Sequence, residues 1–200
     1  MKVGILGGTF DPPHNAHLEI AGAAREKLGL ERVIFMVAGN PRLKNNPAIS
    51  PVGERLHMAR LATTGKPGFI VSDLETHSDK PTRTVETLRQ IQPKAGEQDE
   101  LYFIMGWDNL FKLDKWYRPA EIIDRSIIVA IPRPDCPKPS TDQLEKDLPG
   151  LSRRLVWLDG PWMDISASDI RQRVRNGQDI GNLVPPGVAT YIREKGLYRK

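Results

Sequence analysis

Short apolar runs alternate with longer amphipathic segments along most of this chain, and that alternation constrains the fold more than any other feature. The runs are Lys2–Leu6, Arg32–Val37, Phe69–Val71, Leu101–Met105, Ile127–Ile131 and Leu155–Leu158. Most of them are too apolar to leave one face in water. They therefore predict strands of a parallel sheet that is covered on both faces.

The segments between these runs carry apolar residues at helical spacing. In the first, Leu18, Ala21, Ala24 and Leu28 form one stripe, and Gly29 follows as a helix stop. Similar stripes occur in residues 54–62 and 84–91. Strand–helix repetition predicts an α/β fold with a right-handed, doubly wound parallel sheet. Ligands of such sheets bind beyond the carboxyl ends of the strands.

The length of 200 residues fits one domain, 1–200, and we expect residues 164–200 to form a C-terminal helical part of it. Residues 132–149 hold five prolines, which predicts a surface excursion with a short helix over Ser140–Leu148. No apolar run approaches the ~20 residues of a membrane span. Cys136 is the single cysteine, which excludes a disulfide framework and favours a reducing, cytoplasmic location.

Positive charge is concentrated at the C-terminal end. The chain has 29 Lys and Arg against 25 Asp and Glu, a net charge of +4. Residues 171–200 hold seven of the basic residues and only two acidic ones. This distribution indicates an anionic partner, but it does not distinguish nucleic acid, a membrane surface or a small phosphate.

The first apolar run leads into residues 7–17, GGTFDPPHNAH, which hold the elements of a phosphate site. Gly7 and Gly8 allow the backbone to approach a ligand closely. A helix start after two prolines offers unpaired N–H groups and the positive end of the helix dipole. His14 and His17 share one face of that first turn, and histidines donate to phosphate oxygens, more strongly when protonated. The alternatives are two capping histidines or a metal pair, which lacks nearby carboxylates.

A second constellation, residues 164–171 with the sequence DISASDIR, follows the last apolar run. Ser166 is placed as an N-cap with Asp169 three residues later, a variant of the capping box. The helix start is another set of N–H donors, and Arg171 is a permanently charged group suited to phosphate. The alternative is a well-capped amphipathic helix with solvated arginines.

Together the two segments resemble the signature motifs of the nucleotidylyltransferase superfamily, G-T-F-D-P with H-x-G-H and I-S-x-[ST]-x-[IV]-R. Ala16 replaces the usual glycine, and Ser168 keeps the hydroxyl. The H-x-G-H motif also occurs in class I aminoacyl-tRNA synthetases, which are far longer. Residues 82–88, 105–109, 115–119, 131–134 and 183–198 extend the resemblance to bacterial nicotinate mononucleotide adenylyltransferases along nearly the whole chain. Arg83 replaces a frequent tyrosine of that family, and Trp107 replaces a small residue.

The resemblance implies a Rossmann-like sheet with helices on both faces and a short C-terminal helical extension. It also implies AMP transfer from ATP to nicotinate mononucleotide, giving nicotinate adenine dinucleotide and pyrophosphate in cytoplasmic NAD biosynthesis. The expected partners are ATP and a pyridine mononucleotide, with Mg²⁺ bound to ATP, no metal ligands in the chain, no nucleic acid and no membrane; a homo-oligomer is possible. The alternatives are an adenylyltransferase with another acceptor (nicotinamide mononucleotide or phosphopantetheine) and a non-enzymatic, basic nucleic-acid binder.

The motif residues then receive roles by resemblance. The expected catalytic contacts to ATP phosphates come from His14, His17, Lys44 and Arg171. ATP binding is expected from Gly7, Gly8, Thr9, Phe10, Gly106, Asp108, Ile165, Ser166 and Ser168. Acceptor binding is expected from Thr84, Trp116, Tyr117 and Arg133, because a pyridine ring favours stacking on a flat aromatic partner. Core packing is the alternative for the two aromatic residues, and Arg55 is either a phosphate ligand or a helix-surface charge.

Overall fold

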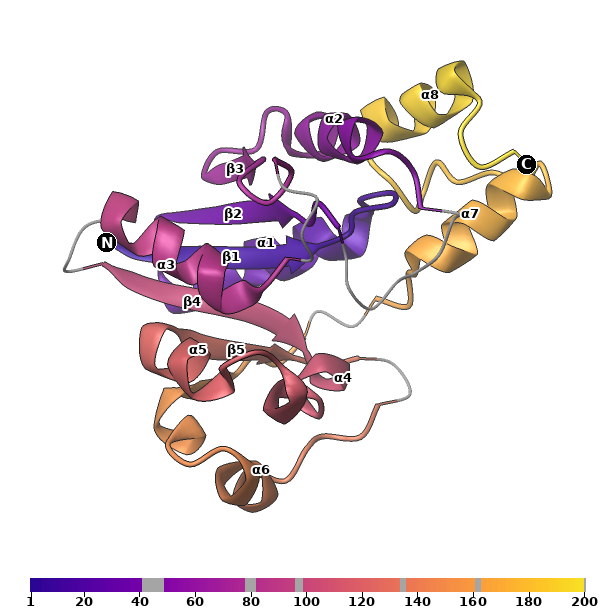
Figure 1. Cartoon of the computed structure of the whole chain (residues 1–200). Coiled ribbons are helices and arrows are strands. Elements are labelled where there is room, and N and C mark those ends of the chain that lie inside the picture. The colour runs from indigo at the N-terminus through magenta and orange to yellow at the C-terminus, as the bar shows by residue number, and fades with distance from the viewer. Residues whose placement is uncertain (41–48, 78–81, 96–98, 134–135, 161–162, 200) are drawn as a thin grey trace.

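Six parallel strands form the sheet that the apolar runs predict. A computed structural model of the chain describes residues 1–40, 49–77, 82–95, 99–133, 136–160 and 163–199. The strands are β1 (Lys2–Gly8), β2 (Arg32–Val37), β3 (Phe69–Ser72), β4 (Glu100–Gly106), β5 (Ile127–Ile131) and β6 (Leu155–Trp157). Their order across the sheet is β3-β2-β1-β4-β5-β6, and every pairing is parallel (Figure 1). From β1 the chain adds β2 and β3 on one side of the sheet, and then β4, β5 and β6 on the other. The position between β1 and β4 is therefore the switch point, where doubly wound sheets bind ligands.

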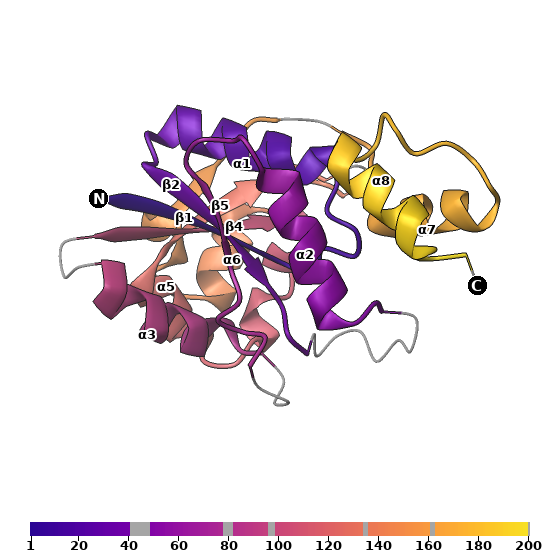
Figure 2. The ribbon, with the colours of Figure 1, turned by 90° about the horizontal axis from the view of Figure 1, so that it is seen from above.

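Helices cover both faces of this sheet. One face packs against α1 (Asn15–Leu28), α2 (Val52–Thr63), α7 (Ala167–Arg175) and α8 (Pro186–Lys195). The other packs against α3 (Thr84–Ala95), α4 (Trp107–Leu110), α5 (Pro119–Arg125), α6 (Thr141–Asp147) and two 3₁₀ turns, Leu113–Lys115 and Leu151–Arg154. Figure 2 shows α1 on one side of the strands and α3 with α5 on the other.

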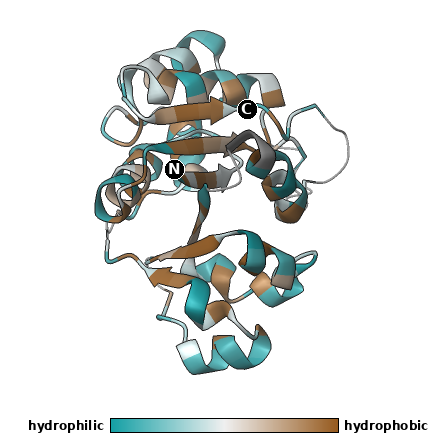
Figure 3. Ribbon diagram, turned by 90° about the vertical axis from the view of Figure 1, so that its left-hand side faces the viewer, coloured by the Kyte–Doolittle hydropathy of each residue, from teal (hydrophilic) through white to brown (hydrophobic). Residues whose placement is uncertain are grey.

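The core divides into two hydrophobic clusters, one on each face of the sheet. Successive residues of β4 alternate between them: Tyr102 and Ile104 join one cluster, whereas Leu101, Phe103 and Met105 join the other. The strands are accordingly the most continuous hydrophobic segments of the ribbon in Figure 3. A strand buried on both sides needs apolar residues at every position, which explains the runs in the sequence.

Local signals set several helix ends. Helix α1 ends at Gly29, which has φ 63° and whose N–H reaches the carbonyls of Arg25 and Glu26. Only glycine adopts this left-handed conformation without steric cost. The Ser140 hydroxyl caps α6 by accepting from the N–H of Gln143 at 3.4 Å. These ends lie where the sequence predicts them.

The proline-rich segment 132–149 is more than the predicted surface excursion. Its helix α6 is present, but Leu144 and Leu148 are buried in the cluster that covers β4 and β5. Burial of two leucines makes this connection part of the core. The prediction failed because prolines indicate irregular backbone and carry no information about the packing of a helix between them.

The C-terminal helical part folds back over α2 and the start of α1, and Figure 1 shows α8 beside α2. The hydroxyl of Tyr191 in α8 donates to the carboxylate of Glu54 in α2 at 2.7 Å. The N–H of Asn15 donates to the carbonyl of Leu183 at 2.9 Å. In the described part of the chain, no helix has the length and apolar character needed to cross a membrane.

Candidate active site

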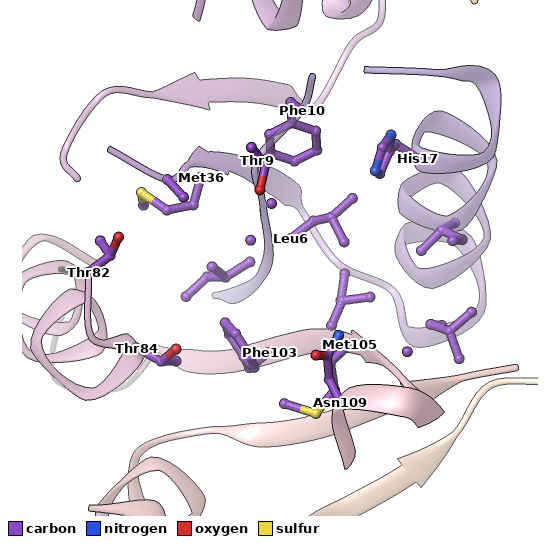
Figure 4. Close-up of a pocket in the computed structure, with 18 of the residues that line it drawn as sticks. Leu6, Thr9, Phe10, His17, Met36, Thr82, Thr84, Phe103, Met105 and Asn109 are labelled. Atoms are coloured by element: carbon purple, nitrogen blue, oxygen red, sulfur yellow. The ribbon is translucent and has the colours of Figure 1, made fainter. Parts of the chain in front are cut away.

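A cavity of about 600 Å³ opens beyond the carboxyl ends of the strands, at the switch between β1 and β4. Figure 4 shows strand ends and the start of α1 around it. Fifteen of the residues expected at the site line it: Gly7, Gly8, Thr9, Phe10, His14, His17, Thr84, Gly106, Trp116, Tyr117, Arg133, Ile165, Ser166, Ser168 and Arg171. Lys44 lies outside the described residues. The structure therefore brings the two sequence motifs to one place.

The turn after β1 is built around Phe10. This residue is 2% exposed and has φ 49°, a strained backbone conformation for a residue with a side chain. Its ring folds over Gly8, where an added Cβ would lie 3.0 Å from a ring carbon. It also meets the His17 ring edge-on, with 4.9 Å between the ring centroids. A side chain at position 8 would therefore push the Phe10 ring away from its place in the turn.

The two motif histidines form a stacked pair at the start of α1. Their ring centroids are 3.7 Å apart and their planes differ by 30°. The backbone N–H of His14 donates to Nδ1 of His17 at 3.2 Å. Because Nδ1 accepts this bond, the neutral His17 ring carries its proton on Nε2. His17, seen at one side of the cavity in Figure 4, therefore has an N–H donor on its outer nitrogen.

His14 differs from its neighbour in being buried and uncharged. It is 4% exposed, and burial together with the nearby Arg133 guanidinium lowers its pKa to about 4. Its Nδ1 has no hydrogen-bond partner among the described residues. Without a bound ligand, His14 is therefore a neutral imidazole near neutral pH.

Arg171 joins the second motif to the first. One guanidinium nitrogen donates to the backbone carbonyl of Asp11 at 2.7 Å, and another donates to the hydroxyl of Ser168 at 3.2 Å. Ser166 accepts from the N–H of Asp169 at 3.0 Å and so caps α7 as predicted. The starts of α1 and α7 thus face one cavity, and each presents N–H groups and a positive dipole end.

Asp11 connects this turn to the end of the chain. Its carboxylate is 3% exposed, accepts from the Tyr198 hydroxyl at 2.6 Å and from the N–H of Ser50 at 3.1 Å. Burial and the adjacent Asp11 carboxylate raise the pKa of Tyr198, so the phenol remains a donor. Asp11 and Tyr198 both belong to segments that the sequence analysis singles out. Their hydrogen bond was not predicted, because no local pattern relates two residues so far apart in the chain.

Arg55 has neither of the two roles considered for it. It is 2% exposed, and its guanidinium donates to the carbonyls of Thr9 at 2.9 Å, Ala38 at 2.6 Å and Gly39 at 2.9 Å. It is therefore an internal brace that holds the ends of β1 and β2 together. A helical stripe of apolar residues does not reveal it, because its carbonyl partners come from other elements.

Aromatic residues gather at the opposite end of the cavity. Trp116 is half-buried and meets Phe103 edge-to-face, with 6.1 Å between the centroids. Tyr117 is 40% exposed, and the Arg83 guanidinium lies 4.0 Å from its ring centroid. Neither aromatic residue is fully enclosed by the core, so a flat ligand ring can reach an aromatic side chain here.

An unpredicted carboxyl, Glu75, also lines this end. It accepts from the Thr87 hydroxyl at 2.5 Å, and burial raises its pKa to about 7. The carboxyl therefore keeps its proton to a higher pH than an exposed glutamate does. No pattern in the sequence marks it, because a carboxyl in a polar loop after a strand is ordinary.

Asp108 is placed differently from the other expected ATP contacts. Its carboxylate accepts from the Arg133 guanidinium at 3.3 Å, and Arg133 in turn lines the cavity, as Asp108 itself does not. A Cβ on Gly106 would fall on the Asp108 carboxylate, so a larger residue there would move the Asp108 side chain. Asp108 thus helps to orient the Arg133 guanidinium that lines the cavity.

The sheet order, the cavity at its switch point and the two helix starts define a nucleotide-binding α/β protein. Residues 5–173 match the cytidylyltransferase-like family. A Dehalococcoides mccartyi protein named "Probable nicotinate-nucleotide adenylyltransferase" is 46% identical over 200 residues, covering 100% of this chain and 98% of its own length. A protein of the same name from Roseiflexus sp. is 40% identical and covers 98% of each chain. The chain belongs to the cytidylyltransferase-like family and, within it, to the nicotinate-nucleotide adenylyltransferases.

Solved structures confirm the fold. The structure titled "Plasmodium falciparum nicotinic acid mononucleotide adenylyltransferase complexed with NaAD" has a TM-score of 0.78 to this chain, covering 98% of it and 97% of its own length. Its sequence identity is 20%, so the likeness concerns the fold. A second structure of that Plasmodium protein, complexed with APC, has a TM-score of 0.76 at 19% identity, covering 98% of this chain and 96% of its own length.

Proposed function

We propose that this chain transfers the adenylyl group of ATP to nicotinate mononucleotide, forming nicotinate adenine dinucleotide and pyrophosphate in NAD biosynthesis. The observation that carries this proposal is a single cavity with two chemically different ends. Histidine, serine, arginine and two helix starts make one end suited to phosphates. Trp116 and Tyr117 make the other suited to a flat ring. The names of the 46% and 40% identical relatives agree with this pairing of ligands.

The reaction requires alignment and charge stabilisation more than proton transfer. The attacking group is the phosphate of the mononucleotide, which is already an anion at neutral pH. An enzyme base is therefore unnecessary, and no enzyme nucleophile is required. The protein must hold the two phosphates in line and stabilise the charge that develops on the leaving pyrophosphate.

We expect His17 to supply such stabilisation at the α-phosphate. Its Nδ1 accepts from the His14 backbone N–H, so the neutral ring carries its proton on Nε2, which can donate to a phosphate oxygen. The starts of α1 and α7 add N–H donors around it. Ser168 and Arg171, together with Lys44, would bind the β- and γ-phosphates.

Mg²⁺ would arrive coordinated by ATP. Among the described residues no three His, Cys, Asp or Glu side chains gather into a possible metal site. The Asp11 carboxylate is occupied by Tyr198 and Ser50, and that of Asp108 by Arg133. The described side chains therefore do not fit a dedicated cage, and phosphate oxygens and water are the ligands that Mg²⁺ prefers.

The experiment is pyrophosphate release from ATP in the presence of nicotinate mononucleotide, nicotinamide mononucleotide or phosphopantetheine in turn. We expect the nicotinate form to give the highest kcat/KM. A preference for phosphopantetheine would contradict the proposal. Binding to duplex or single-stranded nucleic acid that weakens steeply with salt, without pyrophosphate release, would support the basic nucleic-acid binder instead.

A further inference from the structure

We propose that Arg83 is the residue with which this chain selects the acid form of the pyridine ring over the amide form. Its guanidinium, held against the Tyr117 ring at the edge of the cavity, pairs with the ring carboxylate of nicotinate mononucleotide. This inference rests on the proposed function and deepens it by assigning the acceptor selectivity to one side chain.

The backbone of Arg83 is fixed at the start of α3. Its carbonyl accepts from the N–H groups of Glu86 at 2.9 Å and Thr87 at 3.2 Å, so it is the residue that directly precedes the helix and closes its first turn. The residue lines the cavity, and its side chain is 32% exposed. A cation beside a helix start adds to the positive potential of that end. The cavity wall thus presents an anchored cation.

The Tyr117 ring orients the guanidinium. The central carbon of the Arg83 guanidinium lies 4.0 Å from the ring centroid, which is a close cation–π contact. Tyr117 follows Trp116 directly in the chain, so the cation lies beside the aromatic residues that would bind the ring. A planar guanidinium held in this way keeps edge N–H groups for a carboxylate.

Among the described residues, Arg83 has one weak ion pair. Its partner is Glu86 at 3.6 Å, three residues later in the chain, and the Glu86 side chain is 48% exposed. Exposed pairs of this kind contribute little. Glu75, the other acid at this end, is bonded to Thr87 and has a pKa near 7. A ligand carboxylate can therefore compete for Arg83.

The geometry distinguishes the ring carboxylate from the mononucleotide phosphate. Figure 4 shows Thr82 and Thr84, which flank Arg83 in sequence, across the cavity from His17. The acceptor phosphate must meet the ATP α-phosphate near His17, which directs the pyridine ring toward the opposite end. The anion that reaches Arg83 is then the ring carboxylate.

The test compares Arg83→Gln and Arg83→Lys with a matched control, Arg118→Gln. Arg118 also lies over the Tyr117 ring, at 5.4 Å, but it is 54% exposed, pairs with Glu121 and does not line the cavity. KM and kcat are measured for nicotinate and nicotinamide mononucleotides at saturating ATP. Equilibrium binding of nicotinate and nicotinamide adenine dinucleotides gives a readout independent of turnover.

For Arg83→Gln we expect KM for the nicotinate form to rise at least about 10-fold, the scale of one charge-assisted hydrogen bond. The constants for the nicotinamide form, the KM for ATP and kcat stay within about 2-fold, and binding of nicotinate adenine dinucleotide weakens in parallel. Arg83→Lys keeps part of the preference for the nicotinate form. Arg118→Gln changes neither the kinetic constants nor the binding of the dinucleotides.

Three results would overturn the inference. Equal losses with both mononucleotides would place Arg83 on the phosphate or in packing. Unchanged selectivity would show that another group recognises the carboxylate, and the same loss in Arg118→Gln would indicate a general effect of charge. If the unmodified protein transfers adenylyl to neither mononucleotide, the proposed function itself fails, which is distinguishable from each of these results.

Discussion

At the scale of single residues, the two histidines of the first motif have different tasks although their rings stack. His17 uses one ring nitrogen to fix the helix start and leaves the other as a donor. His14 is buried and neutral, with its Nδ1 unpaired among the described groups. The two rings therefore differ in burial and in the hydrogen bonding of Nδ1 although they are in contact.

Two replacements of His17 distinguish the proposed contact of Nε2 with phosphate from the hydrogen bond that Nδ1 accepts at the helix start. Asparagine can place an amide oxygen where Nδ1 accepts the His14 N–H, but it has no group at the position of Nε2. We expect His17→Asn and His17→Ala both to lower kcat by at least about 10²-fold, the scale of one lost charge-stabilising donor. Only His17→Ala should also lose stability, by about 1 kcal/mol in urea unfolding. A near-normal rate in either variant would remove His17 from the reaction.

The buried His14 makes stability depend on pH. The native ring stays neutral down to about pH 4, whereas the unfolded chain takes up the proton near pH 6.5. The unfolded state therefore binds more protons in this window, and stability is lost as the pH falls through it. His14→Phe keeps a stacked ring without titration. From about pH 7.5 to about pH 5, its free energy of unfolding should gain roughly 2 kcal/mol relative to the unmodified protein.

Glu75 provides a control with the opposite sign. Its native pKa of about 7 exceeds the ordinary value of 4.5, so the native state holds the extra proton between these values. That contribution is fully present at low pH and is lost as the pH rises toward 7. Glu75→Gln should therefore lose roughly 2 kcal/mol relative to the unmodified protein over the same acidification. The same pH response in both variants would show that neither group titrates as described.

At the scale of elements, the site depends on three segments that meet at Asp11: the turn after β1, helix α7 and the C-terminal residues. Arg171 binds its carbonyl, and Tyr198 binds its carboxylate. Tyr198→Phe should cost about 1.5–3 kcal/mol in urea unfolding, because a buried carboxylate loses a donor. It should also lower kcat, because the turn after β1 loses its bond to the C-terminal residues, although the Arg171 bond to the Asp11 carbonyl remains.

Tyr191→Phe is the matched control for that prediction. Its hydroxyl donates to Glu54 between α8 and α2, away from the cavity lining. The same atom is removed from the same C-terminal part, so stability should fall while kcat stays unchanged. If Tyr198→Phe also leaves kcat unchanged, the Asp11 junction is structural only.

Sequence patterns predict the elements because their causes are local. Continuous apolar runs marked the strands, Gly29 marked the end of α1, and Ser166 marked the start of α7. The contacts of Arg55 and Asp11 escaped prediction because their partners lie in other elements. Tyr198 is 187 residues from Asp11, and that pairing exists only after the sheet has formed. The motifs thus identified where the site lies, whereas the contacts of Arg55 and Asp11 that support it can be seen only in the folded structure.

At the scale of the whole molecule, the sheet order explains how one cavity acquires two different ends. Strands β1 and β4 are neighbours at the switch point, so the loops after them diverge to opposite sides. The first carries the histidines, and the second leads to Trp116. Of the described basic residues after Ser168, Arg171 lines the phosphate end of the cavity. Arg173 pairs with Asp169 at 3.2 Å, and Arg193 and Lys195 lie on α8, so most of the C-terminal charge excess is outside the cavity lining.

Occupation of either end should stabilise the whole fold, because both ends are built from both halves of the sheet. At about 100 times Kd, a ligand adds roughly 2.7 kcal/mol, which in a chain of this size raises Tm by roughly 5–10 °C. Differential scanning fluorimetry should show this shift with a non-hydrolysable ATP analogue and, separately, with nicotinate mononucleotide. Trp116→Ala should lose most of the response to the mononucleotide and keep the response to the ATP analogue, with KM changing in the same pattern. If Trp116→Ala reduced the Tm shift equally for both ligands, Trp116 would instead have a packing role against Phe103. Loss of that packing would distort both ends of the cavity.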